Sequence, residues 1–280
     1  MALVMIDKLI DKLLGSNVLY YPGCTTKIVL PNLKKLYEEL LRNFCKIDFI
    51  ELGETEVCCG SPALNAGYKQ TFKSLAEKNF KVFKEHRIKK IIVNCPACLK
   101  TFSQDYPKVL EGWNVKVFHM SQILLETLSK ENIKFSDEHN FVTFHDPCYL
   151  GRYSKIYDEP RQIIKILGYN LIEMEETREN SLCCGAGGGV FSNYLPLSKD
   201  IGKRRMEQAK NTKASILCTA CPLCLLSLSL VSNEAHIEMK VVDIAVLVAR
   251  KIKGMEELAR RAEEDVEEFL RSSKLRNQQQ

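Results

Sequence analysis

Short apolar runs rich in β-branched and aromatic residues alternate along this chain with amphipathic segments long enough to form helices. In the first part, apolar runs at 17–21 and 89–94 are separated by two segments, 31–44 and 71–86, whose apolar residues recur at helical spacing. A further apolar run at 47–52 reads as a strand. Strands that alternate with helices are typical of βαβ units, so the pattern predicts an α/β fold with parallel sheets.

The second part of the chain repeats this order of elements. Segments 141–148 and 215–224 begin with apolar runs, and residues 159–168 and 197–210 between them have helical spacing. We therefore expect two tandem βαβ-type domains related by a pseudo-two-fold axis, with an amphipathic helix at each end of the chain.

Five cysteines mark the same repeat. Each half carries a single cysteine, then Cys-Cys-Gly, then Cys-Pro-x-Cys, and equivalent cysteines lie 124 to 126 residues apart. The first set is Cys24, Cys58, Cys59, Cys95 and Cys98, and the second is Cys148, Cys183, Cys184, Cys221 and Cys224. A register shared over five positions indicates a duplication. We place the first domain at 17–138 and the second at 139–252, with a helix at 1–16 before them and a helix and tail at 253–280 after them.

Composition and charge limit the cellular locations and partners to be expected. The 280 residues include 12 cysteines, and 40 basic against 35 acidic residues give a net charge of +5 without a basic block. This weak, dispersed charge does not indicate nucleic-acid binding. Asp7, Lys8, Asp11 and Lys12 interrupt the N-terminal apolar run, which therefore fits neither a secretion signal nor a membrane span. We expect a cytoplasmic protein, where cysteine patterns more often bind metal than form disulfides.

The cysteine motifs are expected where strands end, which is where open α/β sheets build their sites. Cys95-Pro96 and Cys221-Pro222 each follow an apolar run, and proline suits the first turn of a helix. A helix that begins there presents free N–H groups and a partial positive charge. Both features favour thiolates and an anionic iron–sulfur cluster.

The ten repeated cysteines indicate a metal or cluster site rather than simple packing. Thiolate ligands select zinc or iron–sulfur clusters over hard cations. Zinc or a cubane cluster needs four ligands, whereas each half offers five, which favours an iron–sulfur cluster in at least one half. Zinc in both halves is the alternative. Cys45 and Cys218 have no counterpart in the repeat, and we expect packed thiols there, with a spare ligand as the alternative for Cys218.

The sequence motifs around these cysteines resemble those of the cysteine-rich CCG-domain family over residues 17–252. The resemblance rests on YYPGC, CCGSPAL, NCPAC, HDPCYLGR, CCGAGGG and CPLC. That family includes the B-type and D-type subunits of heterodisulfide reductases. It also includes iron–sulfur subunits of glycolate, lactate and glycerol-3-phosphate dehydrogenases, and a subunit of some archaeal succinate:quinone reductases. These motifs are specific for the family and not for one member.

The resemblance implies that each set of five cysteines holds a noncubane [4Fe-4S] cluster, so that all ten cysteines are cofactor and metal ligands. In some members one motif holds zinc instead, which leaves zinc in one half as an alternative. In the reductase, the two clusters flank a disulfide and reduce it by paired one-electron steps. Many relatives carry a ferredoxin-type region that is missing here, so the resemblance implies a ferredoxin-like iron–sulfur subunit and a flavoprotein subunit as partners.

We therefore predict an iron–sulfur oxidoreductase subunit of the heterodisulfide-reductase type, which reduces a disulfide or relays electrons within a complex. The first alternative is an electron-transfer or anchoring subunit of a flavin dehydrogenase that passes electrons to quinone. The second alternative is a zinc-stabilised scaffold without a redox role.

Two polar residues beside a ligand cysteine are candidates for catalysis. His145 precedes Cys148 closely and could protonate a leaving thiolate, because imidazole titrates near neutrality. Arg152 follows the same loop and could neutralise an anionic cluster or a substrate carboxylate or phosphate. The alternatives are a hydrogen-bonded loop histidine and a surface salt bridge. We expect His119, at the end of another strand, to be structural.

Apolar stripes run along both ends of the chain, at 2–14 and 254–275. These helices either pack on this chain's own core or dock on partner subunits. For the N-terminal helix, a third alternative is to lie in a membrane interface, which would associate the protein peripherally with the inner face of the cell membrane.

Overall fold

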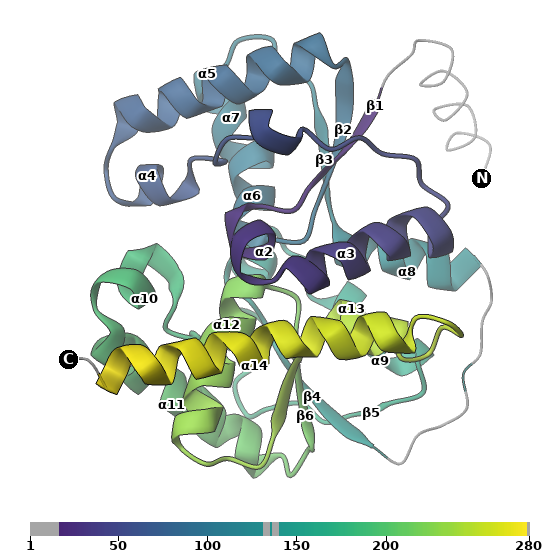
Figure 1. The fold of residues 1–280 in the computed structure, drawn as a ribbon, viewed down its shortest axis with the longest axis vertical. Helices are drawn as coiled ribbons and strands as arrows, with labels where there is room; N and C mark the ends of the chain where they lie inside the picture. The colour runs from purple at the N-terminus through teal and green to yellow at the C-terminus, as the bar shows by residue number, and fades with distance from the viewer. Residues whose placement is uncertain (1–16, 131–134, 136–139, 279–280) are drawn as a thin grey trace.

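The protein contains two parallel β-sheets, one from each half of the chain (Figure 1). This computed structural model describes residues 17–130, 135 and 140–278. The first sheet has the order β1-β2-β3 and the second β5-β4-β6-β7, and every pairing is parallel. The predicted tandem α/β fold is therefore confirmed. The predicted N-terminal helix at 1–16 lies outside the described residues.

The helices and strands of the first half run from β1 to α8. They are β1 (Asn17–Tyr21), α2 (Cys24–Val29), α3 (Pro31–Glu39) with a π-helical turn (Leu40–Phe44), α4 (Ser61–Asn65), α5 (Lys69–Glu85), β2 (Ile88–Val93), α6 (Pro96–Lys100) with a π-helical turn (Thr101–Asp105), α7 (Tyr106–Val109), β3 (Lys116–His119) and α8 (Met120–Lys130).

The second half has the same succession, followed by one long helix. Its elements are β4 (Phe141–His145), a π-helical turn (Tyr149–Tyr153), α9 (Asp158–Ile166), β5 (Asn170–Leu171), α10 (Val190–Asn193), α11 (Leu195–Asn211), β6 (Ile216–Thr219), α12 (Pro222–Glu234), β7 (Lys240–Asp243), α13 (Ile244–Ala249) and α14 (Glu256–Gln278).

The register of the cysteine repeat extends to whole elements. Strand β1 and strand β4 begin 124 residues apart and have five residues each. Helix α5 and helix α11 begin 126 residues apart and have 17 residues each. Equivalent positions in the two halves can therefore be compared residue by residue.

Two details differ from the sequence prediction. The expected strand at 47–52 is reduced to a single parallel bridge between Ile50 and Leu19. It lies at the sheet edge, where pairing gains hydrogen bonds on one side only, and its counterpart β5 has only two residues. Residues 240–249, for which no element is predicted above, form two elements. They divide into β7 and α13 because the Asp243 carboxylate accepts a hydrogen bond from the Ala245 N–H (2.9 Å) and so starts the helix.

The C-terminal helix packs on the chain's own core. Helix α14 crosses both halves and contacts α3, α12 and α13 (Figure 1). Its stripe residues Met255 and Ala262 are buried. The carboxylate of Asp265 accepts hydrogen bonds from the backbone N–H groups of Asn32 (2.8 Å) and Leu33 (2.9 Å) at the start of α3. Among the alternatives for this helix, internal packing is therefore confirmed. No helix in the described part of the chain is long and apolar enough to cross a membrane.

Candidate metal centre

Each half of the fold gathers its five predicted cysteines at the carboxyl ends of its strands. Cys24 is the first residue of α2, just after β1. Cys95 and Cys221 precede α6 and α12, and in both helices proline occupies the first turn as predicted. The structure contains all twelve cysteines as free thiols.

In the first set, the Sγ atoms of Cys59 and Cys98 lie 3.5 Å apart. The Gly60 N–H donates a hydrogen bond to the Cys58 Sγ at 3.4 Å. A side chain at Gly23 would place its Cβ 3.2 Å from the Cys98 Sγ, and the backbone there is left-handed (φ 76°). A glycine therefore lets the backbone approach the sulfurs closely.

The second set repeats these contacts. The Sγ atoms of Cys184 and Cys224 lie 3.2 Å apart, and the Gly185 N–H donates to the Cys183 Sγ at 3.3 Å. Gly185 has a φ of 85°, and a Cβ there would lie 2.1 Å from the Ser198 carbonyl oxygen. The Cys-Cys-Gly turn thus requires glycine for both its conformation and its packing.

The second cysteine of each Cys-Cys pair is poised to be a thiolate. Hydrogen bonds from the Cys58 and Cys98 thiols lower the pKa of Cys59 to about 5. Hydrogen bonds from Cys183 and Cys224 likewise hold the pKa of Cys184 well below its ordinary value. Because the thiolate is the form that binds metal, the two buried cysteines are matched to a ligand role.

One cavity lies between the two sets. Its volume is about 290 Å³. Cysteines from both halves line it: Cys24, Cys59, Cys95 and Cys98 from the first, and Cys148, Cys184, Cys221 and Cys224 from the second. The rest of its wall comes from small, aromatic and uncharged residues, including Gly187–Gly189, Tyr149 and Phe191, with no acidic or basic side chain among the described residues that line it. The fold thus directs both cysteine sets toward a shared space of low polarity.

Neutral side chains hold the Cys-Cys turn of the first set. The Tyr21 hydroxyl donates to the Val57 carbonyl at 2.7 Å. On α5, the buried Asn79 donates to the Cys58 carbonyl at 3.1 Å and to the Tyr106 hydroxyl at 2.9 Å. The Tyr106 hydroxyl in turn donates to the Cys59 carbonyl at 3.1 Å. These bonds hold the Cys-Cys turn through its backbone.

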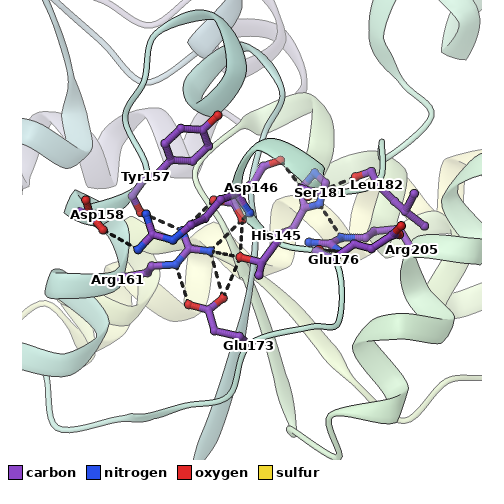
Figure 2. Close-up of polar contacts among 12 residues, drawn as sticks. His145, Asp146, Tyr157, Asp158, Arg161, Glu173, Glu176, Ser181, Leu182 and Arg205 are labelled. Atoms are coloured by element: carbon purple, nitrogen blue, oxygen red, sulfur yellow. Dashed lines mark hydrogen bonds and ion pairs between the residues drawn. The ribbon is translucent and has the colours of Figure 1, made fainter.

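Charged side chains lie near the second set, and Figure 2 shows their contacts with one another. The buried Arg205 of α11 donates from Nε to the Nδ1 of His145 at 3.1 Å. Beside them, the Arg161 guanidinium binds the Asp146 carboxylate through two hydrogen bonds of 2.7 and 2.8 Å and the Glu173 carboxylate at 2.6 Å. The sequence patterns do not single out Arg205 or Arg161. The register of the repeat pairs Arg205 with Asn79. A comparison of the two halves could therefore have identified Arg205 as a charged residue at a position that is neutral in the first half.

The two candidate catalytic residues lie outside the wall of the cavity. His145 is fully buried at the end of β4, and burial lowers its pKa. One of its ring nitrogens lies within 4.8 Å of the sulfurs of Cys184 and Cys224. Arg152 is exposed and donates to the Glu179 carbonyl at 3.0 Å. A catalytic role for either residue stays a prediction.

The remaining singled-out residues lie in structural positions. His119 is buried, and its ring nitrogens contact the Ser121 hydroxyl (2.8 Å) and the Asn94 carbonyl (3.2 Å). Burial lowers the pKa of His119 to about 4. Cys218 is fully buried within β6, and Cys45 is half-buried after the π-helical turn of α3. Neither cysteine lines the shared cavity.

The donor chemistry of the site fits iron–sulfur clusters. Each half offers five free cysteines on three separate segments, with a sulfur contact of 3.5 Å in the first half and 3.2 Å in the second. Soft thiolates suit iron–sulfur clusters and zinc. In the second half, the buried Nε2 of His145 has no hydrogen-bond partner among the described residues, and such an atom is suited to bond with a group held by the cysteines.

Comparison with known proteins agrees with the geometry. Residues 18–103 and 142–229 each match the cysteine-rich (CCG) domain family. The chain is 32% identical over 251 residues to the D-type subunit of the dihydromethanophenazine:CoB–CoM heterodisulfide reductase of Methanosarcina acetivorans, covering 88% of this chain and 60% of that protein. It is 35% identical to the "Probable iron-sulfur-binding oxidoreductase FadF" of Bacillus subtilis, covering 76% of this chain and 31% of that protein.

A third relative is the EtfAB:quinone oxidoreductase of Syntrophomonas wolfei, which is 33% identical and matches 81% of this chain and 33% of its own length. The chain thus spans between about a third and three fifths of the length of these three relatives. They are named as oxidoreductases or as subunits of one. Both halves of this chain match one family, and their cysteines occupy equivalent positions. The chain therefore belongs to the cysteine-rich CCG-domain family of iron–sulfur oxidoreductase subunits.

Proposed function

We propose that this chain carries electrons to a substrate held between two [4Fe-4S] clusters, one on each cysteine set. The observation that carries this proposal is the single cavity lined by cysteines of both halves. A substrate in that cavity contacts both sets at once, which a site on either half alone could not provide. The noncubane form of each cluster comes from the family resemblance.

A disulfide is the substrate class that this cavity suits best. Reduction of a disulfide takes two electrons and two protons and yields two thiols. Clusters bound at the two cysteine sets would supply the electrons one at a time. The uncharged wall excludes competing salt bridges near the sulfurs, and Tyr149 and Phe191 offer apolar contacts to the carbon atoms of the substrate. In this proposal, solvent supplies the two protons.

The protein works with partner subunits in this proposal. The electrons come from a ferredoxin-like iron–sulfur subunit and a flavoprotein subunit, because a one-electron centre cannot take a hydride directly from a nicotinamide. The heterodisulfide reductase relative favours a disulfide acceptor. The name of the EtfAB:quinone oxidoreductase relative favours a second candidate, transfer of electrons to quinone. We place the complex in the cytoplasm, at the inner face of the membrane if the acceptor is quinone.

Metal analysis with electron paramagnetic resonance tests the proposal. The chain is purified without oxygen, and iron, sulfide and zinc are measured. We expect iron and sulfide in both halves and a spectrum that changes when a disulfide is added to the partly oxidised protein. Reduced viologen should support disulfide reduction by the isolated chain, whereas NAD(P)H should not. Zinc without iron would favour the scaffold alternative, and zinc in one half would exclude paired clusters. Turnover with NAD(P)H by the single chain would contradict the need for partners.

A further inference from the structure

The geometry points to Arg205 as a positioning residue that makes His145 a hydrogen-bond donor to the second cysteine set and excludes it as a metal ligand. The inference rests on the proposed function, since it concerns a cluster held by that set. It is carried by the buried contact between the two side chains, which lie on α11 and at the end of β4 (Figure 2).

Arg205 fixes which ring nitrogen of His145 carries the proton. A guanidinium has only N–H donors and no acceptor. Its Nε donates to the His145 Nδ1 at 3.1 Å, so Nδ1 must present its lone pair. The single ring proton of the neutral imidazole therefore lies on Nε2. Arg205 itself is held by bonds from Nη1 to the Glu176 carbonyl (2.7 Å) and the Gln208 side-chain oxygen (2.8 Å).

The acceptors within reach of the His145 ring are sulfurs. This nitrogen is buried and has no hydrogen-bond partner in the described part of the chain. The His145 ring lies within 4.8 Å of the Cys184 and Cys224 sulfurs. Those sulfurs, or a cluster that they hold, are therefore the acceptors within reach. An N–H directed at cluster sulfur is one of the features by which proteins set the cluster potential.

The same contact argues against His145 as a ligand. A histidine that binds metal usually donates its other ring N–H to a carboxylate, a carbonyl or water. Here the other nitrogen faces a cationic donor instead. To bind a metal, Nε2 would need a free lone pair. The ring would then have to lose the proton on Nε2, which is the only proton on its two nitrogens. His145 thus differs from a metal ligand although it lies as close to two cysteine sulfurs as a ligand would.

The first half has no arginine–histidine pair at the equivalent positions. Tyr21 lies at the position of His145 and donates its hydroxyl to the Val57 carbonyl. Asn79 lies at the position of Arg205 and bonds backbone and tyrosine groups. Arg205 also forms no ion pair among the described residues, so its positive charge is not cancelled by direct contact with a carboxylate. The second cluster should therefore have the higher reduction potential.

Variants of His145 test the direction of the N–H group. The amide nitrogen of glutamine can replace Nε2, whereas that of asparagine lies near Nδ1. In the anaerobically loaded full chain, His145→Gln should keep the potential and spectrum of the second cluster. His145→Asn should shift that potential to a more negative value. The signals are assigned to the halves by their loss in Cys59→Ala and Cys184→Ala. Equal potentials in the two His145 variants would overturn the inference.

A double variant separates positioning from charge. Arg205→Met alone should lower the potential of the second cluster and leave the first unchanged. In the His145→Gln background the shift should be smaller, because the ring whose tautomer it fixes is gone and only the loss of its charge remains. An equal shift in both backgrounds would show that Arg205 acts by charge alone and would overturn the inference. Asn79→Ser is the matched control and should leave the second potential unchanged.

Iron and sulfide content distinguishes the two possible failures. A wild-type chain without iron refutes the proposed function and this inference together. Fully loaded variants whose potentials all equal the wild-type value refute only the role of Arg205. If Arg205→Met does not fold, the two His145 variants still decide the question.

Discussion

The two cysteine sets share their motif order and the Cys-Cys-Gly turn but have different surroundings. In the first half, Tyr21, Asn79 and Tyr106 hold the Cys-Cys turn with neutral hydrogen bonds. In the second half, His145 and Arg205 occupy the positions of Tyr21 and Asn79. Duplication thus preserved the ligands and the glycine turns, while the residues one layer behind the sulfurs diverged.

This difference indicates that the two halves are not interchangeable. A neutral and a charged environment give chemically similar clusters different potentials. Two centres with different potentials on either side of one cavity can deliver electrons in a fixed order. We therefore expect the first set to pass electrons on and the second set to hold them longer.

The largest expected effect comes from removing one thiolate from each half. Cys59→Ala and Cys184→Ala should each lose the iron of their own half, about half of the total, because ligand loss uncouples the cluster from its loops. Iron and sulfide analysis with EPR measures this. If either variant kept full iron and both spectra, the assignment of these cysteines as ligands would be wrong.

The next largest effect is expected from alanine at the glycine of each Cys-Cys-Gly turn, and it should differ between the two halves. In Gly185→Ala, the new Cβ meets the Ser198 backbone oxygen, whereas in Gly60→Ala it meets the Phe72 ring at 2.7 Å. Both also strain a left-handed backbone. We expect a loss of roughly 3–5 kcal/mol in the free energy of unfolding for Gly185→Ala and roughly 2–3 kcal/mol for Gly60→Ala, since a side chain can move and a backbone cannot.

Urea unfolding of the anaerobic protein measures both glycine variants. Gly112→Ala is the control, since it has positive φ but open space around its Cβ position. A loss in Gly112→Ala as large as in Gly185→Ala would attribute the whole effect to backbone conformation and not to close packing.

The helices that follow the first ligand loop of each half are stabilised differently. Helix α9 carries Asp158 and Glu159 in its first turn, whereas α3 has no acidic residue there. Asp265 of α14 provides the missing cap from a distance. Asp265→Ala should therefore cost about 1–2 kcal/mol in the free energy of unfolding.

Thermal and urea unfolding measure the loss in Asp265→Ala. Glu264→Ala, next to it on the exposed face of α14, should change stability by less than about 0.5 kcal/mol. Equal losses in the two variants would mean that the remote cap contributes nothing.

The smallest effects are expected at the cysteines outside the repeat. Cys45→Ala and Cys218→Ala should keep full iron, because neither residue lines the cavity. Cys218→Ala should cost about 1 kcal/mol through a cavity in the core, and Cys45→Ala less, because it is only half-buried. Loss of iron in Cys218→Ala comparable to that in Cys184→Ala would show that Cys218 is a ligand.

Local patterns of apolar residues predicted most of the helices and strands. They failed where packing against other elements decides the local structure. The helices at 71–86 and 197–210 have strong apolar periodicity and are present as α5 and α11. The run at 240–249 is apolar except at Lys240 and Asp243, so periodicity alone could not place the change from strand to helix at Asp243. Similarly, the segment at 47–52 has strand-forming residues, but its place at the sheet edge left one bridge.

The sequence by itself determined the duplication, the ten cysteines and their positions at the ends of strands, because these follow from motifs and spacing along the chain. Only the tertiary structure decided that both sets face one cavity, that Asp265 caps α3 and that Arg205 contacts His145. The members of these last two pairs lie 60 or more residues apart. Local periodicity carries no information about such partners, because packing of whole elements brings them together.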